Sequence, residues 1–408
     1  MKRLGGFDVR AASAALFMIA AASAAAPCLA QSVTPAPLPQ AGPLPDAAGA
    51  VQPYGILDAA VRRTDAVSTA GGATQFVAGL NTSRVGLRGK EVIDSDWQAS
   101  FRLETGFSPG TGTQSNSTSL FDRTATVGLR WKSIDFKAGR QEGFGYELAA
   151  NGSTDPLQMA LNLPNYSSPA AAGSKAPILG ANPLQGLYSY TYGQLRFNNS
   201  LRLSTDVDDF SVGVFYALGG VAGDSSAASV RAGHLGWHAG PGQIDAVYQQ
   251  SQDLEGHHSS LYVLAGAVTV ASWKLQAGVH DLKIGAGFNS TNIGNGASSS
   301  GILGTSTTVA TVLATAKEDF TFRVSDVGAT WTVAPGRLLT FAAYKSQTQG
   351  AGSGDDLALA VIGKWYLSPR TCVYVETDHE NSSGRLAIKP VSGSTIATAY
   401  MLGLNVRF

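Results

Sequence analysis

The residues best able to do chemistry are histidines, cysteines and clustered aspartates, and their spacing argues against catalysis. His234 and His238 are four residues apart, which on a strand corresponds to about 13 Å, too far for the two to share a metal ion. Asp206, Asp208 and Asp209 offer carboxylates for calcium, but the further oxygen ligands of a known calcium loop do not accompany them. We therefore expect no metal site.

The other candidates are equally poor. A hydrolase needs a serine or aspartate activated by a histidine, and His257 and His258 are neighbours in or near a loop, where histidines are commonly solvated. Cys28 falls in the N-terminal segment, and Cys372 cannot form an internal disulfide alone. No Walker or dinucleotide glycine pattern lies between a strand and a helix. The sequence thus predicts neither an enzyme nor a cofactor.

Composition restricts the functional class further. The 408 residues include 29 basic and 29 acidic side chains, so the formal net charge is zero, and binding to nucleic acid, which needs a basic excess, is not expected. Hydrophobic residues make up 44% of the chain, too many for a disordered protein. Charged residues make up only 14%, about half the usual share of a soluble domain. A soluble chain of this length would be expected to form two or three domains.

The N-terminus has the pattern of a secretory signal peptide. Lys2 and Arg3 precede the apolar run 11–26, and small residues lead to a plausible cleavage site after Ala30. A membrane-anchor helix is the alternative, but the run is short and Pro27 ends it. We therefore predict three segments, namely a signal peptide (1–30), a Pro-rich linker (31–51) and one domain (52–408).

The remaining domain alternates between apolar and polar residues with period 2. In 97–105, for example, Trp97, Ala99, Phe101 and Leu103 alternate with Gln98, Ser100, Arg102 and Glu104. Similar windows are 210–218, 273–280, 357–367 and 396–408. Their length of about 10 to 12 residues suits a tilted strand crossing a bilayer, and the polar face resembles a wet lumen more than a soluble surface. Tryptophans near the strand ends are typical of interfacial girdles.

The connections also alternate, between short turns such as 240–242, 334–336 and 368–370 and long loops such as 142–186 and 284–317. This predicts an all-β fold, a transmembrane antiparallel β-barrel of about 16 strands, wide enough for an aqueous channel. The alternation changes phase in 319–333 near Ser325 and Asp326, which suggests a bulge or a strand that extends past the membrane.

Several segments, taken in this order and spacing, resemble the general porins of Gram-negative bacteria. They are Tyr54–Asp58, Ser83–Glu91, Phe101–Phe107, Leu120–Leu129, Ala138–Gln141 and the C-terminal Leu404–Phe408. The resemblance implies homotrimers of sixteen-stranded barrels in the outer membrane lipid bilayer, each with a third loop folded into its lumen. It also implies that Phe408 is a signal read by the outer-membrane assembly machinery.

The resemblance further implies a basic cluster that narrows the pore, at Arg84, Arg123 and Arg196. Arg84 has inward parity, because Val85 and Leu87 would face lipid. Arg123 conflicts with the parity of its strand, unless the strand start is irregular or that face is buried in a trimer. Three guanidiniums in one narrow polar pore repel each other, so such a cluster would cost stability and suggests a function.

Opposing carboxylates are expected at Glu147 and Asp155 in the third loop, with Glu104 as a wall charge. The function we predict is passive diffusion of ions and small hydrophilic solutes through a water-filled lumen. A substrate-selective channel is the alternative, since tyrosines gather near the third loop, at Tyr146, Tyr166, Tyr188, Tyr190 and Tyr192. The sequence leaves the preference for anions or cations open.

Overall fold

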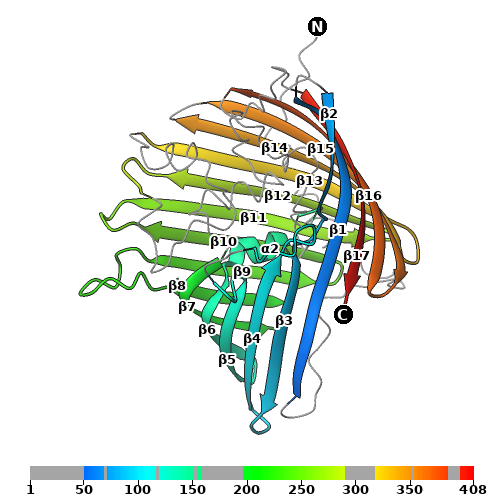
Figure 1. Cartoon of the computed structure of the whole chain (residues 1–408). Helices are drawn as coiled ribbons and strands as arrows, with labels where there is room; N and C mark the ends of the chain where they lie inside the picture. The colour runs from blue at the N-terminus through cyan, green and yellow to red at the C-terminus, as the bar shows by residue number, and fades with distance from the viewer. Residues whose placement is uncertain are drawn as a thin grey trace.

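The computed structural model describes residues 50–68, 71–115, 119–150, 155–157, 196–289, 318–350, 353–384 and 396–408. In these ranges one antiparallel sheet closes on itself as a barrel (Figure 1). The predicted signal peptide, nearly all of the predicted linker and four of the five tyrosines (Tyr166, Tyr188, Tyr190 and Tyr192) lie outside the described residues. The first strand begins at Ala50, two residues before the predicted start of the barrel domain.

The described strands are long, between 8 and 19 residues. They are β1 (Ala50–Ser68), β2 (Gly71–Ala78), β3 (Ser83–Val92), β4 (Trp97–Phe107), β5 (Thr124–Trp131), β6 (Ile134–Glu142), β7 (Arg196–Val207), β8 (Phe210–Ala217), β9 (Val230–Ala239), β10 (Gly242–Gln252), β11 (His258–Val270), β12 (Trp273–Ile284), β13 (Phe320–Ala334), β14 (Arg337–Gly350), β15 (Gly354–Ser368), β16 (Thr371–Gly384) and β17 (Ile396–Arg407).

The seventeen described strands occupy sixteen positions around the ring. The first part of β1 pairs with β3, and its second part pairs with β2, so β2 and β3 together form one wall position that is interrupted at 79–82. On its other side β1 pairs with β17, which closes the barrel. The predicted sixteen-stranded antiparallel barrel is therefore confirmed.

A buried carboxylate lies at the interruption between β2 and β3. Asp58 Oδ1 accepts a hydrogen bond from the Tyr374 hydroxyl at 2.7 Å, and Oδ2 accepts one from Asn405 Nδ2 at 2.7 Å. The Asn81 backbone N–H donates to Oδ2 at 3.0 Å, and the Leu80 N–H donates to the Tyr374 hydroxyl at 3.1 Å. Asp58 thus links the two terminal strands to β16 and satisfies backbone groups that the interrupted ladder leaves unpaired.

Removal of the Tyr374 hydroxyl tests this closure. We expect Tyr374→Phe to lower the free energy of unfolding by about 1–2 kcal/mol, because Asp58 loses a donor and Leu80 N–H loses its acceptor inside the barrel. Tyr400→Phe is the matched control, since Tyr400 lies on the outward face and is half exposed. Urea unfolding followed by tryptophan fluorescence measures both, and equal effects of the two variants would contradict the role of Asp58.

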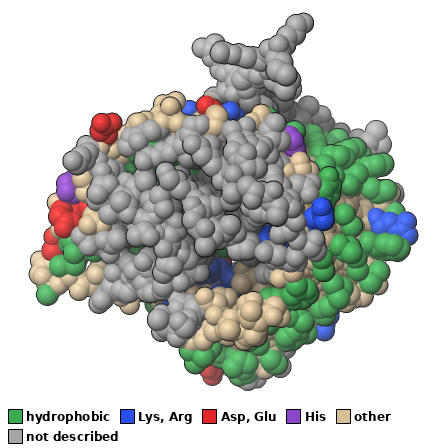
Figure 2. Space-filling view, turned by 45° about the horizontal axis from the view of Figure 1, so that its top comes forward, with side chains coloured by type: hydrophobic (Ala, Val, Ile, Leu, Met, Phe, Trp, Pro, Cys, Tyr) green, Lys and Arg blue, Asp and Glu red, His purple; other side chains and the backbone are tan. Residues whose placement is uncertain are grey.

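The strand alternation separates an apolar outer face from a polar inner one. Val127, Val375 and Leu402 are each more than half exposed on the outer face, whereas inward charges such as Glu104 and Glu376 are almost fully buried. Figure 2 shows hydrophobic side chains covering one flank of the molecule. This distribution is opposite to that of a soluble protein and suits a wall between lipid and a polar interior.

Tryptophans form part of an aromatic belt at the short-turn end. Trp97 and Trp131 face each other on β4 and β5 with ring centroids 6.1 Å apart, and Trp273 and Trp331 on β12 and β13 stack at 5.5 Å. Trp365 on β15 lies at the same end and is half exposed. The predicted position of tryptophans near the strand ends is thus confirmed on three parts of the ring, and it is typical of an interfacial girdle.

Connections at this end are two to four residues long, whereas most of those at the other end are longer. Lys132, Asp208 and Ala271 take positive φ in two-residue turns, as such hairpins require. Helix α2 (Phe144–Ala150) follows β6. Among the described residues, no helix is long and apolar enough to cross a membrane.

The connection after β6 folds into the barrel. Helix α2 lies inside the ring of strands (Figure 1). Its Phe144 packs against Phe215 and His234, on the inner faces of β8 and β9. Further along, Pro156 lies against Gly328 of β13, and the Tyr344 hydroxyl of β14 donates to Asp155. Since β6 and β14 lie on opposite sides of the ring, the chain has crossed the lumen. The predicted inward third loop is confirmed.

The interpretation of a bulge near Ser325 and Asp326 was wrong. Strand β13 pairs without a shift through both residues with β12 and with β14. The phase change arises because Phe320, Phe322 and Val324 face inward, where they are buried with other apolar side chains at the long-loop end. These residues are apolar because they pack against other apolar side chains inside the barrel; the strand does not turn its other face to the lumen.

Candidate pore constriction

Strands β3 to β7 present a row of arginines to the lumen. Val85 and Leu87 of β3 point outward and are exposed, so the alternation of the strand turns Arg84 and Arg88 inward. The same alternation on β4 turns Arg102 and Glu104 inward beside them, because β3 and β4 pair in register. One sector of the inner wall therefore carries most of the charge near the third loop.

Glu104 is the centre of this sector and is almost fully buried. Its Oε1 lies 2.6 Å from Arg123 Nε and 3.9 Å from Arg84 Nη1, and its Oε2 lies 2.8 Å from Arg102 Nη2. The Tyr54 hydroxyl also donates to Oε2, at 2.8 Å. One carboxylate thus screens three guanidiniums, which reduces the repulsion that would otherwise force them apart.

A second ion pair extends the cluster toward the third loop. Arg196, the first residue of β7, pairs with Glu142 at the end of β6, and its guanidinium lies 5.3 Å from the centre of the Tyr146 ring in α2. The charges of Arg123 and Arg196 both act on Arg84, so the two groups form one electrostatic unit. We call Arg84, Arg102, Arg123, Arg196, Glu104 and Glu142 the constriction cluster.

A third pair lies closer to the short turns. Arg202 of β7 pairs with Glu147 of α2, and its guanidinium lies 4.4 Å from the centre of the Phe144 ring. A polar cavity of about 320 Å³ adjoins this pair, and the side chains of His234, His238 and Asp245 also line it. The third loop is thus fixed to the wall by ion pairs as well as by apolar packing.

The structure brings together four of the six predicted constriction residues, because Arg84, Arg123, Arg196 and Glu104 lie in the constriction cluster. The parity conflict at Arg123 disappears because β5 begins one residue later, at Thr124. Glu147 does lie in the third loop, but it pairs with Arg202 and not with the predicted arginines.

Asp155 is placed elsewhere in the lumen. It is fully buried, accepts hydrogen bonds from the Tyr344 hydroxyl and from the Leu157 N–H, and lies on the side of β13 and β14. Sequence reasoning missed Arg102, Glu142 and Arg202. The inward parity that Arg102 shares with Glu104 could have identified it, whereas nothing local in the sequence marks the partners of Glu142 and Arg202.

The two histidines of β9, His234 and His238, contact the same acidic side chain despite their spacing of four residues. His234 Nε2 and His238 Nε2 each lie 2.9 Å from the same Asp245 Oδ1. The two histidines thus share one carboxylate. Among the described residues, a set of three potential metal-ligand atoms within 4.8 Å of one another occurs only elsewhere, at Asp253, Glu255 and His257.

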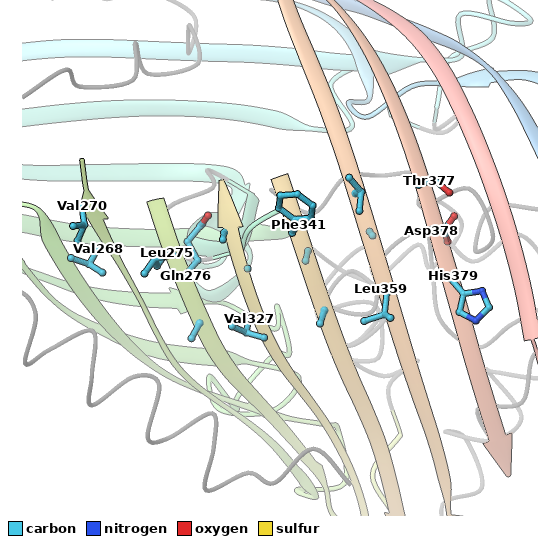
Figure 3. Close-up of a pocket in the computed structure, with 17 residues that line it drawn as sticks. Val268, Val270, Leu275, Gln276, Val327, Phe341, Leu359, Thr377, Asp378 and His379 are labelled. Atoms are coloured by element: carbon cyan, nitrogen blue, oxygen red, sulfur yellow. The ribbon is translucent and has the colours of Figure 1, made fainter. Parts of the chain in front are cut away.

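A second hollow, which is apolar, is not part of the passage. It has a volume of about 840 Å³ and lies across β11 to β16, where Leu275, Phe341 and Leu359 line it (Figure 3). These side chains share the exposed, outward parity of Trp273 and Trp365. We therefore assign this apolar hollow to the lipid-facing surface of the wall.

Comparison with known proteins agrees with this geometry. The sequence profile described as Gram-negative porin matches residues 12–385. The chain belongs to the Gram-negative porin family. A stretch of 80 residues is 42% identical to an outer membrane porin protein of Bordetella pertussis and covers 19% of this chain and 20% of that protein. Family and relative place the porin in the outer membrane.

Several solved structures share the fold at low identity. An anion-selective porin from Comamonas acidovorans matches with a TM-score of 0.61 and 17% identity, over 88% of this chain and 99% of that one. OmpT of Vibrio cholerae in a trimer form matches with a TM-score of 0.57 and 12% identity, over 89% and 100%. OmpF of Salmonella typhi, in complex with daunomycin, matches with a TM-score of 0.55 and 13% identity, over 88% and 97%.

Proposed function

We propose that this porin is a water-filled channel for passive diffusion of ions and small hydrophilic solutes across the outer membrane. The observation that carries the proposal is the closed ring of sixteen strand positions, apolar outside and charged inside, with the third loop crossing its lumen. A ring of this size leaves room for an aqueous channel, which the loop then narrows. Such a channel needs no chemical step, and we infer a transport protein and not an enzyme.

The constriction cluster supplies the field that sorts solutes. Arg84, Arg123 and Arg196 are proposed as its basic side, with Glu104 as acidic partner and Glu147 as a further loop carboxylate, paired with Arg202. Glu104 holds the guanidiniums of Arg84 and Arg123, whereas Glu142 and the ring of Tyr146 hold that of Arg196. A fixed row of charges in a narrow polar passage discriminates ions by their sign and solutes by size.

Asp155 has a different proposed role. Its hydrogen bond from Tyr344 holds the loop against the wall opposite β6, and its bond from the Leu157 N–H is local to the loop, so Asp155 contributes to the width of the passage more than to the basic cluster.

We further propose a homotrimer, supported by the trimer form of OmpT, the outer membrane protein of Vibrio cholerae. The C-terminal residue is proposed as the assembly signal. Phe408 exchanges backbone hydrogen bonds with Gly55 of β1 at 3.0 and 3.1 Å, and its ring is exposed on the outer face. If the assembly machinery recognises β17 before the barrel closes, β1 is therefore the last strand to pair with it.

Swelling of proteoliposomes in sugars of increasing size tests the diffusion mechanism. We expect the swelling rate to fall smoothly with solute size, because the passage has no dedicated binding step. A rate that saturates for one solute class, while solutes of similar size remain slow, would instead support the substrate-selective alternative. Vesicles that hold heat-denatured porin provide the control for leakage.

A further inference from the structure

Two histidines line the lumen at the short-turn side of the constriction cluster and take no part in that cluster. We call His234 and His238, both on the inner face of β9, the histidine pair. The Nε2 atom of each ring lies 2.9 Å from the same oxygen of Asp245 on β10. Asp245 is fully buried, whereas the side chain of His238 is about half exposed. The histidine pair is thus held by a carboxylate and remains accessible to water.

A glycine allows the histidine pair to meet on one carboxylate. Positions 234, 236 and 238 of β9 share the inner face, and Gly236 is paired directly with Asp245. A Cβ atom on Gly236 would lie 2.6 Å from Asp245 Oδ1 and 3.0 Å from His238 Nε2. Any side chain at this position would therefore push the rings away from the carboxylate. The two rings lean toward each other over the glycine.

The charge of this group depends on the protonation of its rings. An ionised carboxylate only accepts hydrogen bonds, so each ring presents a protonated Nε2 to Asp245. A neutral imidazole in this form can still take up a second proton on Nδ1. The histidine pair and Asp245 together carry a charge of −1 when both rings are neutral and +1 when both are protonated. Histidine is the side chain that ordinarily changes its charge between about pH 5 and 8.

The other charges around the histidine pair cancel one another. The polar cavity of about 320 Å³ that the pair borders is also lined by three basic and three acidic side chains: Arg130, Lys137, Arg202, Asp135, Glu147 and Asp206. Lys137 pairs with Asp135 at 2.7 Å, and Arg202 pairs with Glu147. Because these six charges sum to zero, the sign of the charge on the cavity wall depends on the histidine pair.

The histidine pair lies where the third loop narrows the lumen. The ring of His234 stacks on that of Phe144 in α2, with the ring centroids 5.4 Å apart. The same Phe144 ring contacts the guanidinium of Arg202, which pairs with Glu147 of the loop. A change of charge on the histidine pair therefore acts on ions that pass between the loop and the wall.

We propose that His234 and His238 form a titratable selectivity element that makes the porin more selective for anions in mild acid. The inference rests on the proposed diffusion function and adds a response to pH. When the rings take up protons, the charge of the cavity wall changes from −1 toward +1, while guanidiniums and ordinary carboxylates keep their charges. No movement of the third loop is needed, because the charge alone alters the electrostatic barrier for ions.

Reversal potentials in a KCl gradient, measured in planar bilayers near pH 7.5 and near pH 5.5, test the proposal. We expect the ratio of chloride to potassium permeability to rise about threefold on acidification. The double variant His234→Gln/His238→Gln should lose most of this rise, because glutamine can donate a hydrogen bond to Asp245 but takes up no proton. The variant should match the wild type near pH 7.5, a result that a merely structural role of the rings does not predict.

His379→Gln is the matched control, since His379 lies on the outward face of β16, where it is bonded to Thr398. It should keep the full rise. His238→Gln alone serves if loss of the less exposed His234 ring prevents folding, and it should keep a smaller rise than the wild type.

A wild-type permeability ratio that does not change with pH would overturn the proposal. So would the full rise in the double variant or, if that variant does not fold, in His238→Gln. Either result would leave the diffusion function intact, because the channels would still conduct. The absence of any channel conductance would instead refute the diffusion function, and the selectivity element with it.

Discussion

Glu104→Gln is expected to destabilise the barrel by about 3 kcal/mol and to shift its ion preference toward anions. The reason is that one buried carboxylate compensates Arg84, Arg102 and Arg123, and its loss leaves three guanidiniums in mutual repulsion. The glutamine keeps the shape of the side chain, so the effect reports charge. The electrostatic potential at the narrowest part of the passage becomes more positive, which should favour anions.

Urea unfolding and reversal potentials in a KCl gradient measure these two effects. Glu91→Gln is the matched control, because Glu91 lies on the adjacent strand β3 with its side chain exposed on the outer face. The control should change neither quantity measurably. If Glu104→Gln were as stable as the control and equally selective, Glu104 would not be the centre of the constriction cluster.

The second large effect concerns the arginines themselves. Replacing Arg84 and Arg123 together with glutamine should shift selectivity toward cations, since two positive charges leave the wall while the carboxylates of Glu104 and Glu142 remain. With water-like screening the change in barrier is about 1 kcal/mol, or about fivefold in the permeability ratio. Reversal potentials in a salt gradient give this ratio directly.

Arg231→Gln is the control for the loss of a positive charge. Arg231 lies on the outer face of β9 near the loops, where it is exposed and bonded to Gln250. It should leave the reversal potential unchanged. A double variant of Arg84 and Arg123 that behaved like this control would remove the basic side of the constriction from the mechanism.

The alternation of single strands made much of the wall predictable. Because side chains on a strand alternate between two faces, the outward position of Val85 and Leu87 was enough to place Arg84 in the lumen. The same rule places Arg102 and Glu104 inward. It fails at Arg123, because the rule applies only within a strand and β5 starts at Thr124.

Partners across the lumen could not be predicted in this way. Asp155 is bonded to Tyr344, 189 residues later in the sequence, and no local pattern encodes that contact. The interruption between β2 and β3 is equally hidden, since it depends on Asp58 meeting Tyr374 and Asn405 from the far end of the chain. Local periodicity determines whether a side chain faces the lumen or the outside, whereas its bonding partner depends on tertiary contacts.

Apolar residues inside the barrel misled the sequence interpretation of β13. Phe320 and Phe322 are fully or almost fully buried on the inner face together with Leu282 and Ile284 of β12. A purely aqueous lumen would disfavour these residues, so their alternation looked like a change of face. The wall is polar where it faces the constriction cluster and apolar at the loop end of β11 to β13.

Single-channel recording of the wild-type porin in planar bilayers tests the central claim most directly. We expect discrete conductance steps, three of equal size for each inserted trimer, with a current that rises in proportion to salt concentration, as for a water-filled passage. The absence of discrete steps, or a current that saturates because one solute occupies a binding site, would contradict a channel for passive diffusion.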